Sequence, residues 1–172
     1  VALFPGGSEA NVSASLGQWK LPVSYLTCAP DNALTTNALQ YLSELGVDTS
    51  KTILEGNRLG LYFLLSANGL TSGQVVYDRK FSSFSSIKPG VIDWEKVLDG
   101  YTWLHWTALT PALNENTAAV CKEVLAAARK KGITISVDLN YRNRLWDYGK
   151  QPIEVMPELI QYCDVIMGNI WA

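Results

Sequence analysis

Histidine and cysteine are scarce in this 172-residue sequence, which contains one histidine and three cysteines. Cys28, Cys121 and Cys163 lie far apart and include no C-x-x-C pair, so we expect neither a structural zinc site nor a disulfide framework. We interpret all three as small buried hydrophobic residues. His105 lies in the apolar run 101–106, where a lone histidine is more typical of a hydrogen-bonded core residue than of a catalyst.

Long apolar runs and clusters of one charge sign are also missing. No run could span a bilayer, and the amino end lacks the charged and apolar regions of a secretion signal. The net charge is −2, and the basic run 129–131 lies at a predicted helix end, where it complements the helix dipole. We therefore expect no nucleic-acid or membrane partner and a cytoplasmic location. Because the chain starts at Val1 and stops just after a predicted strand and turn, we expect a piece of a longer protein.

The apolar content of 48% is enough to bury a substantial core. Strand-like and helix-like segments alternate along the chain, a pattern that predicts a single partial α/β domain with a mainly parallel sheet. The predicted strands are 22–27, 52–54, 102–106, 133–137 and 164–167, and the predicted helices are 12–19, 31–45, 93–98, 114–131 and 152–162.

Two further strand-like runs, 59–65 and 74–79, are joined by a loop rich in turn formers and predict a β-hairpin. Strand alternation places Tyr77 and Arg79 on one face, with Tyr62 on the partner strand within reach. Such a face could cover a ligand. It could equally belong to an amphipathic hairpin that packs Tyr77 against its own sheet, and from these residues alone the second interpretation is favoured.

The strand 133–137 leads into a polar tip that contains Asp138, Asn140, Arg142 and Arg144. Ligands of open α/β sheets bind outside the carboxyl ends of the strands, and right-handed crossovers would bring Asn169 to the same rim. An ordinary loop with solvated charges is an equally compatible interpretation of the tip.

A second polar segment, residues 6–11, precedes the first predicted helix. Gly6 and Gly7 leave backbone N–H groups open to a polar ligand, since no Cβ blocks close approach. Asn11 in the first turn could cap the helix or reach the same ligand.

In chain order, these segments resemble the ribokinase-like (PfkB) sugar kinases, and within them the 2-keto-3-deoxygluconate kinases. The resemblance implies a three-layer αβα sandwich in which the hairpin at about 59–79 forms a lid. It also implies ATP and Mg²⁺ as cofactors and a sugar acid that is phosphorylated to its 6-phosphate. The matching segments are 6–11, 46–49, Tyr62, 76–79, 138–142 and 168–169.

The same resemblance implies roles for individual residues. Gly7 and Asn11 would contact substrate hydroxyls, and Tyr62 and Tyr77 would line the lid. Arg79 and Arg142 match positions that hold the substrate carboxylate, a task suited to the two-pronged guanidinium group. Asn140 would lie on the sugar–phosphate side, and Asn169 near the ATP phosphates.

Two departures from the family pattern concern the chemistry. Ala172 stands where the family commonly has a glutamate that organises the Mg²⁺–phosphate site, so we assign no metal ligand. The Gly-Ala-Gly-Asp segment, which supplies the anion hole and the aspartate base, belongs to an ATP-binding half that these residues do not include. We interpret Asp138 as structural, assign no catalytic residue, and expect no turnover by these 172 residues alone.

Alternative functions remain open at this stage. A PfkB kinase for a neutral sugar, such as fructose or ribose, would not need paired arginines. A catalytically inactive sugar-acid sensor would agree with Ala172 and the missing base. A Rossmann oxidoreductase is disfavoured, because no G-x-G-x-x-G follows the first strand. A homodimer through the lid would cover the exposed edge of the hairpin.

Overall fold

The computed structural model describes residues 3–65 and 73–170, which fall into two compact units. The first unit contains residues up to Pro5 and Ser13–Ser86, and the second contains Gly6–Val12 and the chain from Ile87 onward. Within this described part, no helix combines the length and apolar character needed to cross a membrane.

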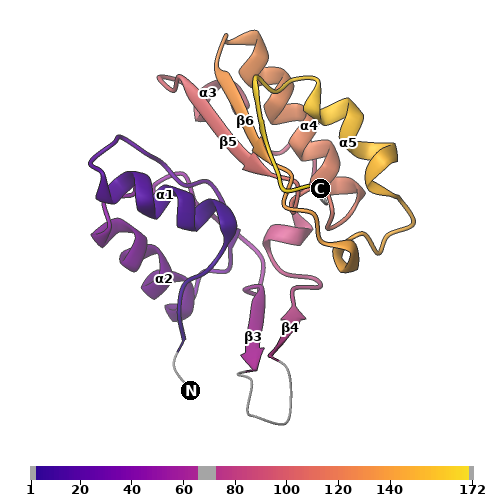
Figure 1. The fold of residues 1–172 in the computed structure, drawn as a ribbon. Coiled ribbons are helices and arrows are strands. Elements are labelled where there is room, and N and C mark those ends of the chain that lie inside the picture. Colours follow the sequence, from indigo (N-terminus) through magenta and orange to yellow (C-terminus); the bar gives the residue numbers. More distant parts are fainter. Residues whose placement is uncertain (1–2, 66–72, 171–172) are drawn as a thin grey trace. The chain divides into compact units, whose positions relative to one another are not determined.

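The first unit contains a short βαβ arrangement, whose helix α2 (Ala33–Glu44) is labelled in Figure 1. Strands β1 (Cys28–Ala29) and β2 (Ile53–Leu54) are parallel neighbours joined through helix α2. Asn32 caps α2, because its side chain accepts a 3.0 Å hydrogen bond from the Thr35 N–H. The predicted alternation of strand and helix is therefore present here.

The predicted strand at 22–27 is wrong in its position, since regular pairing begins only at Cys28. Within 22–27, Ser24 forms an isolated parallel bridge with Asp48. The partner segment then turns, with the Ser50 N–H donating to the Asp48 side chain and the Thr52 N–H to the Thr49 carbonyl. This turn interrupts the ladder, so the two segments pair at two separate points.

Helix α1 (Ser8–Gln18) begins one turn earlier than the predicted start at residue 12. Gly7, immediately before it, has φ +136, a conformation that favours glycine. In the first unit, the end of α1 lies against the end of α2. A Cβ on Gly17 would lie 2.4 Å from the Leu45 carbonyl oxygen, and Gly46 has φ +87, so the two backbones meet without intervening side chains.

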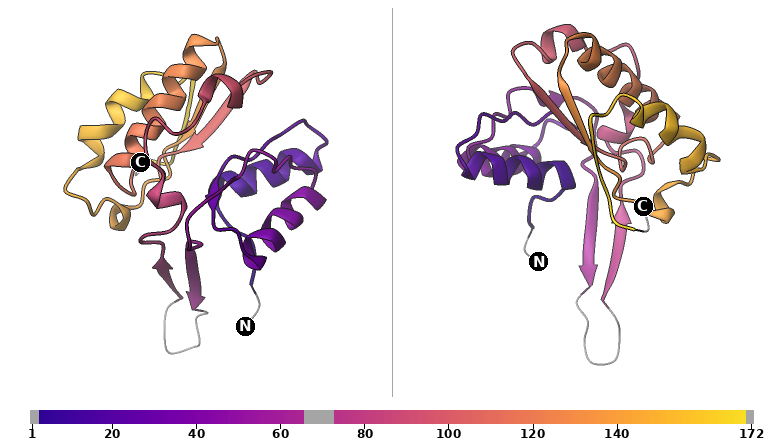
Figure 2. Two further views of the ribbon diagram at one scale, coloured as in Figure 1. Left: turned by 180° about the vertical axis from the view of Figure 1, so that it is seen from behind. Right: turned by 45° about the horizontal axis from the view of Figure 1, so that its top comes forward.

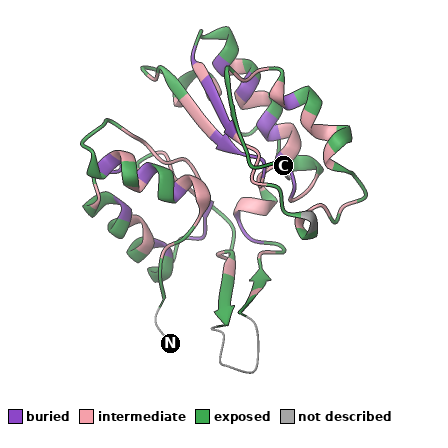
Figure 3. Cartoon of the chain, in the orientation of Figure 1, coloured by how far each residue is buried: buried purple, intermediate pink, exposed green. Residues whose placement is uncertain are grey.

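Strands β3 (Leu61–Leu65) and β4 (Gln74–Asp78) pair antiparallel, as the hairpin prediction required. The loop predicted to join them lies largely outside the described residues. Most side chains on both faces of this pair are exposed (Figure 3). After β4 the chain makes a four-residue turn in which the Ser82 N–H donates to the Arg79 carbonyl, followed by the 3-10 helix η1 (Phe84–Ser86).

The second unit contains a three-stranded parallel sheet in the order β5 (Trp103–Thr107), β6 (Thr134–Asp138), β7 (Val165–Met167). Helices α4 (Glu115–Lys130) and α5 (Pro152–Ile160) cover one face of this sheet (Figures 1 and 2). The short helices α3 (Trp94–Val97) and η2 (Asn143–Leu145) complete the unit. The buried core lies between sheet and helices and comprises Leu98, Trp106, Cys121, Leu125, Ala128, Ile133, Ile135, Val137 and Leu159.

On the other face of this sheet, polar groups alternate with the core residues. Trp103 Nε1 donates to Ser136 Oγ at 2.8 Å, and His105 Nδ1 lies 2.9 Å from the same oxygen. The expectation of a fully hydrogen-bonded histidine is only half right, because Nε2 finds no partner among the described residues. Burial lowers the pKa of His105, so the ring is neutral at pH 7.

The cysteines behave as expected, with one difference in burial. All three are free thiols, and Cys28 and Cys121 are buried whereas Cys163 is half-buried. Burial raises the pKa of each thiol above its usual value, so the thiols remain protonated at neutral pH.

Candidate functional site

The carboxyl ends of three parallel strands meet at one rim of the second unit. Thr107 of β5 is in register with Asp138 of β6, and Asp138 is in register with Met167 of β7. Asn140 and Arg142 follow β6, and Asn169 follows β7. The predicted meeting of these three strand ends at one sheet edge is therefore confirmed.

Asp138 shapes the turn at the end of β6. Its Oδ1 accepts a 3.0 Å hydrogen bond from the Asn140 N–H, and Asn140 has φ +32. Asparagine tolerates this left-handed backbone better than most residues. The contact agrees with a structural role for Asp138 and directs the loop that carries Asn140 and Arg142.

Arg142 is exposed, and its Nη1 donates to the Tyr141 carbonyl at 2.9 Å. It forms no ion pair within the described chain. The loop is anchored further along, where the Tyr148 hydroxyl donates to the Pro111 carbonyl at 2.9 Å. Burial raises the pKa of Tyr148 to about 12, so this hydroxyl keeps its proton.

A side-chain clasp fixes the first turn of α1 to the same rim. Thr107 Oγ1 donates to Glu9 Oε1 at 2.9 Å, and Ser8 Oγ donates to Glu9 Oε2 at 2.7 Å. Thr107 is fully buried at the end of β5. The clasp holds Gly7 beside the rim and keeps Asn11, whose N–H donates to the Gly7 carbonyl at 2.9 Å, in the same turn.

The hairpin of the first unit carries the second group of predicted residues. Tyr62 and Tyr77 are direct cross-strand partners. The Arg79 guanidinium carbon lies 4.7 Å from the Tyr77 ring centroid and 5.6 Å from that of Tyr62. These are cation–π distances, so the two rings contact the charged end of Arg79. A guanidinium also carries N–H donors in a planar fork that suits an anion.

Arg79 is half-buried and has no carboxylate partner among the described residues. The tyrosine rings contact this charged group, and no carboxylate of the described residues neutralises its charge. The predicted grouping of Tyr62, Tyr77 and Arg79 on one face is confirmed by this geometry.

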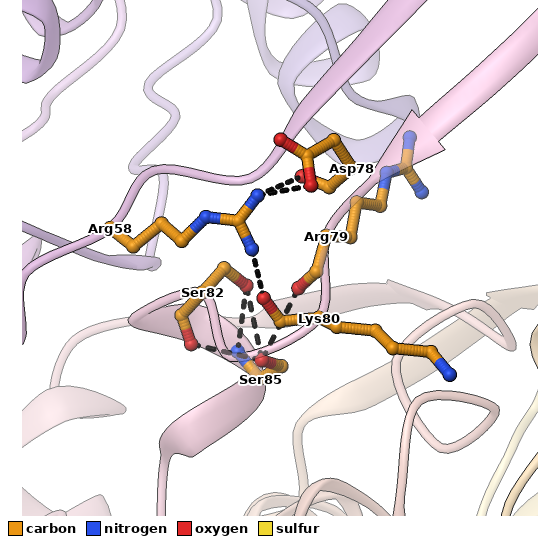
Figure 4. Close-up of polar contacts among 6 residues, drawn as sticks. All are labelled: Arg58, Asp78, Arg79, Lys80, Ser82 and Ser85. Atoms are coloured by element: carbon orange, nitrogen blue, oxygen red, sulfur yellow. Dashed lines mark hydrogen bonds and ion pairs between the residues drawn. The ribbon is translucent and has the colours of Figure 1, made fainter.

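A second arginine lies at the base of the same hairpin. The Arg58 guanidinium forms an ion pair with Asp78 and donates to the Lys80 carbonyl (Figure 4). Ser85 contributes from the other side, since its Oγ lies 3.5 Å from the Arg79 carbonyl. These contacts fix the backbone carbonyls on either side of Arg79 and that of Arg79 itself.

The predicted site residues are divided between the two units. Tyr62, Tyr77 and Arg79 gather in the first unit. The second unit holds the other group, which comprises Gly7, Asn11, Asn140, Arg142 and Asn169.

The sequence did not reveal Arg58, Glu9 or Thr107 as parts of these groups. Glu9 could have been suspected from its place inside the segment 6–11. Arg58 offered no such signal, because it reaches its partners 20 and 22 residues away through a side chain.

An open groove of about 530 Å³ lies between α2 and β2 in the first unit. Its lining includes the carboxylates of Asp31 and Glu44 but no cationic residue and none of the predicted site residues. It is therefore unsuited to a sugar acid. Nor does the described chain gather three histidine, cysteine, aspartate or glutamate side chains that could hold a metal ion.

Comparison with known proteins agrees with this arrangement. Residues 1–170 match the pfkB family of carbohydrate kinases. The 2-dehydro-3-deoxygluconokinase of Bacillus subtilis is 32% identical over 169 residues, which cover 95% of this chain and 51% of the relative. The 2-dehydro-3-deoxygalactonokinase of Haloferax volcanii is 27% identical over 140 residues, covering 81% of this chain and 44% of the relative.

Among solved structures, the 2-dehydro-3-deoxygluconokinase of Thermotoga maritima superposes with a TM-score of 0.87 and 40% identity, covering 95% of this chain and 50% of that one. The chain therefore spans about half the length of the relatives it matches.

The chain belongs to the PfkB family of carbohydrate kinases, and its fold is ribokinase-like, as expected.

Proposed function

We propose that this protein transfers a phosphoryl group from ATP to 2-keto-3-deoxygluconate, also called 2-dehydro-3-deoxygluconate, and forms the 6-phosphate. The observation that carries this proposal is Arg79, a half-buried residue whose guanidinium lies over two tyrosine rings and has no carboxylate partner among the described residues. A neutral sugar would not need such a group, whereas the carboxylate of a keto acid pairs with it through two parallel hydrogen bonds. The names of the Bacillus and Thermotoga relatives support the same substrate.

The proposal gives each of the predicted site residues a role. Arg79 and Arg142 bind the carboxylate, and Tyr62 and Tyr77 pack on the carbon chain. Residues of the rim bind the remaining polar atoms, with Gly7 and Asn11 on the hydroxyls, Asn140 on the side of the transferred phosphoryl group and Asn169 near ATP.

Phosphoryl transfer depends mainly on positioning and on stabilisation of charge. The described residues supply positioning, and none is assigned as the proton acceptor for the substrate hydroxyl. They also lack a protein-held metal set, so Mg²⁺ would arrive bound to the ATP phosphates, as it commonly does in kinases. Ala172, where the family commonly has a glutamate, lies outside the described residues.

The test is an ADP-coupled kinase assay on the complete gene product with ATP and Mg²⁺. The substrates are 2-keto-3-deoxygluconate, its galactonate epimer, fructose and ribose. We expect turnover with the keto acids alone. Turnover with fructose or ribose alone would contradict the proposal. Binding of a keto acid without turnover would identify a sensor.

Replacement of Arg79 tests the carboxylate contact directly. A hydrogen bond to a charged group contributes about 1.5–3 kcal/mol, so Arg79→Ala should raise KM for the keto acid roughly 10- to 150-fold. The KM of Arg79→Lys should lie between those of the wild type and Arg79→Ala, because an ammonium group keeps the charge and loses the two-pronged geometry. Arg144→Ala, at an exposed arginine of the rim loop, is the matched control. An unchanged KM in Arg79→Ala would remove the basis of the proposal.

A further inference from the structure

Arg58 contacts the residues on both sides of Arg79 and has no part in the proposed function. Its guanidinium pairs with the Asp78 carboxylate, donates to the Lys80 carbonyl, and lies 3.4 Å from the Asp78 carbonyl (Figure 4). Its own backbone is fixed as well, since the Ser83 N–H donates to the Arg58 carbonyl at 2.8 Å. Arg58 is thus joined to the chain that leaves β4.

In this arrangement the Asp78 carboxylate neutralises Arg58 and not Arg79. Asp78 is the chain neighbour of Arg79, so a carboxylate released from Arg58 would be the acidic group nearest to Arg79 along the chain. The carboxylate is instead occupied by Arg58, and Arg79 lies over the rings of Tyr77 and Tyr62. If Asp78 occupied the donor fork of Arg79, a substrate carboxylate would have to displace it.

We propose that Arg58 is a positioning residue that engages Asp78 and so keeps Arg79 available to the carboxylate of the substrate. The identity of that ligand rests on the proposed function, whereas the division of charge between the two arginines does not. The Arg58 and Asp78 side chains are 35% and 50% exposed, and ion pairs in such surroundings contribute little to stability. Variants at either position should therefore fold.

The first experiment measures whether Arg79 is paired, without any substrate. Phenylglyoxal reacts with arginine side chains that are not engaged in ion pairs, and mass spectrometry of the complete gene product gives a labelling rate for each arginine. Exposed Arg144 is the internal reference. Arg58→Ala should slow labelling of Arg79 by about threefold or more, because Asp78 then pairs with it. The double variant Arg58→Ala with Asp78→Asn should restore the rate.

The second experiment reads the same change through kinetics. Arg58→Ala should raise KM for the keto acid about five- to tenfold and leave kcat within about twofold, because binding of the carboxylate weakens before the chemical step. Adding Asp78→Asn should return KM to within about twofold of the wild type. Lys122→Ala, which breaks another exposed ion pair with Glu158 on α4 and α5, is the matched control and should change neither value.

The outcomes separate the two proposals. Two results would overturn the proposed role of Arg58: unchanged labelling of Arg79 in Arg58→Ala, or a raised KM that Asp78→Asn does not restore. Arg58 would then act only through its hydrogen bonds to the backbone. If the wild type phosphorylates only neutral sugars, the proposed function fails, and the labelling experiment still decides whether Arg58 keeps Arg79 unpaired.

Discussion

Phe81 illustrates how a single residue can be held in an unfavourable conformation beside a binding group. It is the third residue of the turn that begins at Arg79, it has φ +58, and it is 84% exposed. A left-handed backbone costs an ordinary residue about 1–2 kcal/mol, and the exposed ring regains little of this by packing.

Phe81→Asn should therefore stabilise the protein by about 0.5–1 kcal/mol, since asparagine adopts positive φ more readily. The measurement is the midpoint of urea unfolding for the complete protein. Phe81→Ala is the control, because it removes the same ring without tolerating the conformation better. If both variants stabilised the protein equally, the gain would come from removing the exposed ring and not from relief of the backbone conformation.

Prediction from sequence succeeded for residues where alternation alone fixes the outcome. The period of two in a strand placed Tyr77 and Arg79 on one face, and the structure shows both beside Tyr62. It could not find Arg58, because a contact between a side chain and a distant carbonyl leaves no spacing pattern. The contact of Glu9 with Thr107 could not be predicted either, since the two residues are 98 positions apart.

At the scale of elements, Asp164 joins three of them at the amino ends of the strands. Just before β7, its Oδ2 accepts a 2.8 Å hydrogen bond from the Ile135 N–H of β6, and its Oδ1 accepts one of 2.9 Å from Arg129 of α4. The hydrogen bond from Ile135, followed by the contact with Arg129, lowers the pKa of Asp164 below its ordinary value of 3.8.

This shift predicts a pH dependence with a defined sign. The pKa of Asp164 is lower in the folded protein than in the unfolded chain. Its contribution to stability is therefore fully present above about pH 4 and is lost as the pH falls through the pKa of the folded protein. Asp164→Asn should lower the unfolding midpoint at pH 7 and flatten its decline below pH 4. Asp31→Asn, at an exposed carboxylate of the first unit, is the control. A wild-type decline that persists unchanged in Asp164→Asn would contradict the assignment.

The elements of the second unit were predicted closely because each carries its own signals. Helix α4 begins with a capping box between Asn114 and Thr117 and is followed by Gly132 at φ +70. The strand predicted at 22–27 was misplaced because its pairing is not a local property of the sequence. It depends on a turn in the partner segment after Asp48. Likewise, α1 begins at Ser8 where a tertiary contact with Thr107 holds its first turn.

At the scale of the whole molecule, the hairpin has two apolar faces and the proposed substrate uses one. Tyr62 and Leu64 share the face of Arg79, whereas Phe63 and Leu65 point to the opposite face, where they are 47% and 52% exposed. An exposed antiparallel pair with an apolar second face is suited to association with another copy of itself.

We therefore expect the complete gene product to be a homodimer through β3 and β4. Light scattering after gel filtration should give twice the protomer mass, and Leu65→Lys should convert it to the monomer mass. Leu64→Lys, on the substrate face, is the matched variant and should remain dimeric. A monomeric wild type would contradict this assembly.

The contact between Gly17 and Gly46 has a consequence for protein engineering. Replacing a glycine inside a helix by alanine is a common route to greater heat resistance, because it improves helix propensity by about 1 kcal/mol. At Gly17 the added methyl group would overlap the carbonyl oxygen of Leu45, so the same exchange would push two helices apart. A stabilisation campaign on this protein should leave that pair of positions untouched.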